Sequence, residues 1–190
     1  MGFLDALLGK RKVSKVAPDR LFAITTATIT LETGLDIRTR GKAAVVFQPL
    51  ATGDFEQIAK DVEELVRSTG EETGTTVASS ADEFGYRWFA LTDPDVEDLA
   101  VAINAVTDAL SVGGYADRLL CAVFAYEDAA GKPIYFIYNF KRGAWYPFVP
   151  APGAQARSNE RELQLKAQLA GELPFEAELE RWFPLWGAPI

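Results

Sequence analysis

The segment 117–150 constrains the fold most, because three apolar runs follow one another closely within it. Residues 119–126 and 134–140 are short and rich in β-branched and aromatic side chains, and the acids and glycine between them are typical of a turn. A third run covers 144–149. We therefore expect three consecutive strands, of which the first two form a hairpin.

Neither strand of this hairpin alternates apolar and polar residues. Because successive side chains of a strand point to opposite faces, Phe136 and Tyr138 are expected on one face and Tyr135 and Ile137 on the other. Both faces of the sheet should then be covered by other parts of the chain. Such a sheet is typical of a scaffold rather than of an active centre.

Helical periodicity and short apolar runs organise the rest of the chain. The segment 21–34 has strand composition but helical spacing, and the spacing favours a helix. Thr92 or Asp93 is the expected N-cap of the third helix, and Gly70 is the expected end of the second. The expected helices are 21–34, 54–68, 95–112 and 158–170, the last capped by Ser158 or Asn159. The further expected strands are 43–47, 75–79 and 86–91.

These patterns predict an α+β fold, in which an antiparallel sheet packs with amphipathic helices. The order helix, strand, strand occurs twice, which suggests two similar halves, 17–92 and 93–173, although no residues align between the copies. The tail, 174–190, places Trp182 and Trp186 among prolines. We expect it to dock on the domain of residues 17–173, and the alternative is an exposed interface.

The first 16 residues form a segment of their own. Its apolar residues share one side of a short helix and are followed by a basic cluster, as in helices that rest at a membrane surface. The alternatives are a loose terminus and a helix that docks on the body of the protein. The candidate membrane contacts are Phe3, Leu4, Leu7, Leu8, Lys10, Arg11 and Lys12.

The net charge and the single cysteine limit which classes of partner and which cellular compartment are expected for this protein. The formal net charge of -8 disfavours binding to nucleic acid, which requires clustered cations. The single cysteine, Cys121, lies in an apolar strand and is expected to be a buried, inert thiol. No apolar run approaches the length of a membrane span, and the order of the first residues does not fit a secretory signal. A cytoplasmic protein, with peripheral attachment at the inner face of the membrane as an option, is therefore expected.

Catalytic chemistry is hard to find in this sequence. Histidine is absent, and no paired-cysteine, phosphate-binding or nucleophile motif is present. The acids fall on polar helix faces or in turns, so we expect no catalytic residues, cofactor or metal. A small-ligand binding domain or a carboxylate-dependent enzyme of unknown substrate remains the alternative.

The turn 141–143 is the most suggestive polar feature. Lys141 and Arg142 precede Trp145 and Tyr146, so the segment is either a simple hairpin turn or a site that receives an acidic partner through ion pairs and cation–π contacts. The candidate partner contacts are Lys141, Arg142, Trp145, Tyr146, Trp182 and Trp186.

Four stretches of the chain resemble the PspA-associated protein PspAB family. They are MGFLDALLG at 1–9, LFAI at 21–24, KRGAWYPF at 141–148 and RWFPLWG at 181–187. The resemblance implies association with phage shock protein A, a coiled-coil protein that binds the inner face of stressed membranes. It implies no catalytic residues. We therefore expect a non-enzymatic accessory protein of the envelope-stress response that acts by protein contact.

Overall fold

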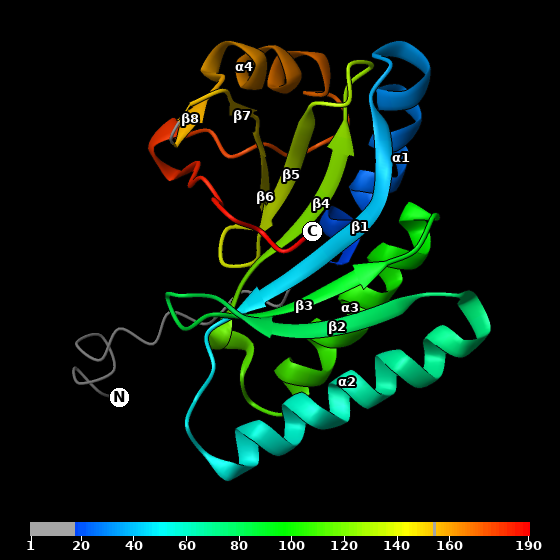
Figure 1. Ribbon diagram of the computed structural model, residues 1–190, viewed down its shortest axis with the longest axis vertical. Helices are drawn as coiled ribbons and strands as arrows, with labels where there is room; N and C mark the ends of the chain where they lie inside the picture. Colours follow the sequence, from blue (N-terminus) through cyan, green and yellow to red (C-terminus); the bar gives the residue numbers. More distant parts are fainter. Residues whose placement is uncertain (1–17, 154) are drawn as a thin grey trace, which may run out of the picture.

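The computed structural model describes residues 18–153 and 155–190 of the 190-residue chain (Figure 1). The helices of these residues are α1 (Pro18–Gly34), α2 (Gly53–Thr73), α3 (Val96–Val112) and α4 (Asn159–Gln168), with short 3-10 turns η1 (Ala116–Arg118) and η2 (Leu179–Arg181). The strands are β1 (Arg38–Phe47), β2 (Thr76–Ala81), β3 (Arg87–Thr92), β4 (Leu119–Glu127), β5 (Pro133–Asn139), β6 (Ala144–Phe148), β7 (Pro150–Ala151) and β8 (Ala156–Arg157).

Six of these strands form one antiparallel sheet in the order β2-β3-β1-β4-β5-β6. The predicted hairpin is confirmed, since β4 pairs with β5 from Cys121 opposite Asn139 to Glu127 opposite Pro133. Together with the four helices, the sheet confirms the α+β class. The order helix, strand, strand occurs twice here as well, but both copies belong to this one sheet, and β1 lies between them.

The helices cover one face of the sheet, which we call the inner face. In Figure 1, α1 and α3 lie behind the strands, and α2 runs beside β2 and α3. Side chains of all four helices, such as Leu21, Phe55, Leu99 and Leu165, pack there against alternate residues of the strands. The predicted core face of α3 is confirmed by its buried residues Val96, Leu99, Ala100, Ile103, Val106 and Leu110.

The opposite, outer face of the sheet is covered in part by the C-terminal tail, which crosses the front of the strands in Figure 1. Trp182 is only 5% exposed and stacks on Tyr146, with 6.2 Å between the ring centroids. Trp186 meets Phe148 edge-on at 4.9 Å. Apolar cover on both faces accounts for the absence of a polar face in β4 and β5.

The predicted end of α2 and the predicted N-cap of α3 differ from the structure. Helix α2 continues past Gly70 to Thr73, and Gly74 ends it in the left-handed conformation (φ 93°). A Cβ at Gly70 would overlap the carbonyl oxygen of Thr75, so this glycine permits a close approach of two backbone segments. The predicted end of the helix at Gly70 is therefore wrong.

The predicted N-cap of α3 is also wrong, because Asp95 caps the helix by accepting from the backbone N–H of Glu97. Asp93 is buried instead. Its carboxylate accepts hydrogen bonds from the Thr75 hydroxyl at 2.7 Å and from the Asp95 N–H at 2.8 Å. Asp93 thereby ties the start of β2 to the start of α3. At α4, by contrast, Ser158 is the cap, which is one of the two predicted residues.

Candidate functional site

The outer face is hollowed at one end of the sheet by a groove of about 550 Å³, which we call the outer groove. Strand ends supply its floor, because β1, β3, β4 and β6 all contribute a side chain there. One wall is the β2–β3 turn, and the other is residues 183–186 of the tail. The floor consists of Val46, Trp88, Leu120, Cys121 and Tyr146.

The wall at the β2–β3 turn is held by a single carboxylate. Asp82 accepts hydrogen bonds at 2.9 Å from the backbone N–H groups of Phe84 and Tyr86, and at 2.9 Å from the indole N–H of Trp88. These bonds join the turn to the floor of the groove. Phe84 is left 74% exposed at the rim, where its ring is available to a partner.

The wall at the tail is fixed by hydrogen bonds to its backbone. The Tyr146 hydroxyl donates to the carbonyl of Phe183 at 3.1 Å, and the Arg157 guanidinium donates to the carbonyl of Trp182 at 2.6 Å. Phe183 itself is 60% exposed. The outer groove thus lies between two anchored walls, each of which presents an exposed phenylalanine.

The ionisable groups on the floor are neutral near pH 7. Burial raises the pKa of the Cys121 thiol to about 12 and raises the pKa of the Tyr146 hydroxyl well above its ordinary value. Charged residues occur only at the edges of the lining, where Asp82 and Glu83 contribute acids and Lys141 contributes a cation. The groove therefore offers an apolar floor with a charged rim, suited to an amphipathic ligand.

The predicted partner contacts are divided between the two faces of the sheet. Lys141, Tyr146 and Trp186 line the outer groove, and Trp182 packs beside it on Tyr146. Trp145 is fully buried on the inner face, where its indole N–H donates to the carbonyl of Arg20 at 2.7 Å.

Arg142 does not line the groove, because its guanidinium pairs with Glu176 at 2.9 Å. It therefore serves to hold the tail. The predicted membrane contacts, Phe3, Leu4, Leu7, Leu8, Lys10, Arg11 and Lys12, lie outside the described residues.

Several groove residues were not singled out in the sequence. Val46, Leu120 and Leu185 belong to segments far apart in the chain, and no local pattern joins them. The sequence around Phe84 does indicate an exposed aromatic side chain, since this large residue stands in a turn beside acids and glycine. Such a residue has few ways to be buried, and its exposure points to an interface.

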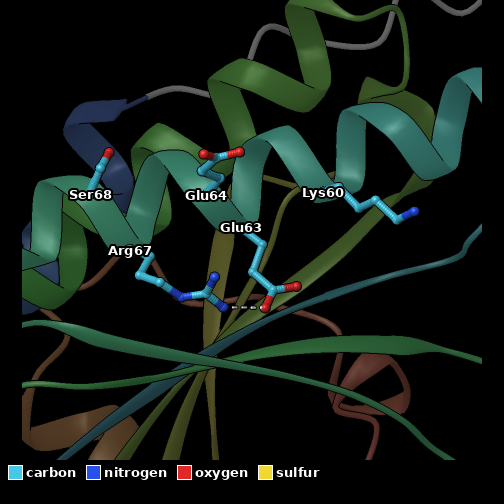
Figure 2. Close-up of a pocket in the computed structure, with 5 residues that line it drawn as sticks. All are labelled: Lys60, Glu63, Glu64, Arg67 and Ser68. Atoms are coloured by element: carbon cyan, nitrogen blue, oxygen red, sulfur yellow. Dashed lines mark hydrogen bonds and ion pairs between the residues drawn. The ribbon is translucent and has the colours of Figure 1, made fainter.

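A second hollow lies beside α2 and is lined by Lys60, Glu63, Glu64, Arg67 and Ser68 (Figure 2). All five residues belong to one helix. Arg67 and Glu63 form an ion pair at 2.8 Å, and Figure 2 shows Glu64 pointing away from it. Opposite charges that pair along one helix are typical of a solvated face. Among the described residues, no group of three or more His, Cys, Asp and Glu side chains is arranged to hold a metal ion.

None of the helices in the described ranges is long and apolar enough to cross a membrane. The fold and the outer groove define a small α+β protein with an apolar groove on the outer face of its sheet. The chain belongs to the PspAB family, PspA associated protein B, whose family model matches residues 1–190. The resemblance seen in the sequence motifs is thereby confirmed. Searches of curated proteins and of solved structures gave no match to this chain.

Proposed function

We propose that this protein is a non-enzymatic accessory protein of the envelope-stress response, which contacts phage shock protein A directly through the outer groove. The observation that carries the proposal is the groove itself, an apolar floor between two exposed phenylalanines, Phe84 and Phe183. A coiled-coil partner consists of amphipathic helices, and a groove of this kind receives the apolar side of such a helix. The family name supports the choice of partner.

The chemistry of the groove supports a role without catalysis. The Asp82 carboxylate is committed to three hydrogen bonds, and the Cys121 thiol is protonated because burial raises its pKa to about 12. The Cys121 thiol is therefore unsuited to transfer protons near neutral pH, where a general acid or base needs a pKa close to the working pH.

Binding of purified phage shock protein A to groove variants tests this proposal. Phe84→Ser combined with Phe183→Ser should weaken binding about tenfold or more, because exposed aromatic anchors carry much of the energy of such interfaces. Ile29→Ser is the matched control, since Ile29 is 63% exposed on α1 and does not line the groove. Equal binding by the parent and the double variant would exclude the groove as the contact.

The proposal includes peripheral attachment to the inner face of the cell membrane through residues 1–15. In a helix, Phe3, Leu4, Leu7 and Leu8 would enter the headgroup region while the basic cluster 10–12 met anionic lipid. The full chain should sediment with vesicles that contain phosphatidylglycerol, and Leu4→Glu with Leu7→Glu should abolish this. Sedimentation that is equal for the two chains would remove the membrane part of the proposal.

A small apolar ligand is the second candidate for the outer groove. Its volume, about 550 Å³, falls within the range of ligand pockets, and its floor is apolar. Native mass spectrometry of protein purified from its own cells tests this role. A bound species of constant mass, lost in Phe84→Ser with Phe183→Ser, would favour it.

A further inference from the structure

The start of α1 and the outer groove lie at the same end of the sheet. The guanidinium of Arg20, in the first turn of α1, donates a hydrogen bond to the carbonyl of Gly143 at 3.1 Å. Gly143 belongs to the β5–β6 turn, and the same turn contributes Lys141 to the lining of the groove. One short turn therefore separates the first residues of α1, on the inner face, from the groove on the outer face.

The residues that precede α1 are long enough to cover the groove. Seventeen residues stand before Pro18, and an extended chain of that length spans at most about 60 Å. That length allows residues 13–17 to pass the β5–β6 turn while the residues before them reach across the floor.

The composition of this segment matches the groove in both polarity and charge. In a helix, Phe3, Leu4, Leu7 and Leu8 would share one side, and this apolar side would be complementary to the apolar floor. The cluster Lys10-Arg11-Lys12 follows directly. The β2–β3 wall offers Asp82 and the exposed Glu83 as acids, so the basic cluster has a charge partner at the rim.

We infer that residues 3–12 occupy the outer groove of their own chain when neither phage shock protein A nor a membrane is present. This inference rests on the proposed function, because it describes the regulation of the same groove. The segment and a partner helix then compete for one floor. An anionic membrane, which binds the same apolar side of the segment, frees the groove for the partner.

The competition has a predictable size. If the segment fills the groove nine-tenths of the time, only a tenth of the molecules are open to the partner, and the apparent affinity falls about tenfold. Leu4→Glu with Leu7→Glu should empty the groove. This full-length variant is therefore expected to bind phage shock protein A about tenfold more tightly than the parent in the absence of membranes.

A nitroxide label near the N-terminus tests the occupancy directly, with no partner present. The label is attached at Ala6→Cys in a Cys121→Ala background, because in a helix residue 6 would lie off the side formed by Phe3, Leu4, Leu7 and Leu8. Nuclear magnetic resonance signals of the Phe84 amide and the Trp88 indole should broaden strongly. Signals of Gly131, in the β4–β5 turn at the other end of the sheet, should not change.

Three results would overturn the inference. They are an absence of broadening at Phe84 and Trp88, broadening that persists after Leu4→Glu with Leu7→Glu, and broadening that is equally strong at Gly131. A second copy could also be the occupant. A mixture of nitroxide-labelled chain without ¹⁵N and ¹⁵N-labelled chain without nitroxide tests this, because broadening then arises only between two chains. Broadening in that mixture would overturn the intramolecular form, and unchanged signals would support it.

The same variants separate this inference from the proposed function. Loss of partner binding in Phe84→Ser with Phe183→Ser, without broadening in the free chain, would support the proposed function and overturn the inference. Broadening in the free chain, with partner binding unaffected by these two substitutions, would support occupancy by residues 3–12. It would overturn the groove as the partner site.

Discussion

Arg142 and Glu176 form an ion pair with 2.9 Å between Nε and Oε2, and this pair joins the β5–β6 turn to the C-terminal tail. The backbone of Trp145 makes a second connection, since its N–H donates to Pro174 and its carbonyl accepts from Glu176. The edge of β6 is thereby covered by the tail. Because residues 183–186 form one wall of the outer groove, these contacts support the groove as well as the fold.

The ion pair predicts a stability difference that depends on pH. Burial alone would raise the pKa of Glu176, but hydrogen bonds from Arg142 and from the Glu178 N–H bring it below the ordinary value of 4.5. A carboxylate whose pKa is lower in the folded state stabilises the protein fully above about pH 4.5. This contribution is lost as the pH falls through the folded pKa.

Glu176→Gln should therefore lower the urea midpoint at pH 7, and the difference from the parent should shrink as the pH falls below about 4.5. Glu180→Gln is the control, because Glu180 is exposed in the same tail and such surface substitutions change stability by at most about 0.5 kcal/mol. A difference between Glu176→Gln and the parent that stays constant from pH 7 to pH 3 would contradict the role of the carboxylate.

Gly70 is predicted to be required despite its place inside a helix. Alanine in a helix interior is ordinarily more stable than glycine by about 1 kcal/mol. At Gly70 the added Cβ would meet the backbone of Thr75, and overlap with backbone cannot be relieved by a side-chain rotation. Gly70→Ala should therefore destabilise the protein by about 2 kcal/mol or more.

Thermal unfolding of two glycine variants measures this balance. Gly34→Ala is the matched control, because Gly34 is the last residue of α1 and a Cβ there meets no atom within 4 Å. It should be neutral or slightly stabilising. An equal or higher melting temperature for Gly70→Ala than for the parent would show that the two backbone segments can separate at little cost.

Loss of the buried hydrogen bond between Tyr126 and Thr28 is predicted to destabilise the protein less than Gly70→Ala does. The Thr28 hydroxyl donates to the Ile24 carbonyl, so it accepts from the Tyr126 hydroxyl at 2.7 Å. Tyr126→Phe removes this donor from the interface of α1 and β4 and should cost about 1 kcal/mol, or about 2–4 °C in melting temperature. Tyr86→Phe, at an exposed turn, is the control, and equal melting temperatures for the two variants would contradict the prediction.

Local patterns in the sequence are sufficient to predict most of the helices and strands. The hairpin of β4 and β5 follows from two apolar runs and an acidic, glycine-containing turn, and the core face of α3 follows from its spacing. The errors at Gly70 and at Asp93 have one cause. Gly70 lies against the backbone of Thr75 and Asp93 accepts from its hydroxyl, and such tertiary contacts leave no local pattern.

The candidate site was predicted less well than the fold. Trp145 and Tyr146 both follow the cationic turn 141–143, yet adjacent residues of a strand face opposite sides, and only Tyr146 lines the groove. The alternation of side chains along a strand is enough to predict that Trp145 and Tyr146 lie on opposite faces. The groove cannot be predicted in this way, because its floor and walls come from strand ends, a turn and a tail that meet only in the folded chain.

Cys121 is predicted to be almost unreactive in the folded protein, although it lies on the floor of the outer groove. Burial raises its pKa from 9.0 to about 12, which lowers the thiolate fraction at pH 8 about a thousandfold. Labelling with an uncharged maleimide should be at least about tenfold slower than labelling of Val112→Cys in a Cys121→Ala background, since Val112 is 90% exposed and the higher nucleophilicity of a high-pKa thiolate offsets only part of the lost thiolate fraction. The rate should rise about tenfold per pH unit, and urea should abolish the difference. Native Cys121 that reacts as fast as the exposed control would show that the groove floor is open to water.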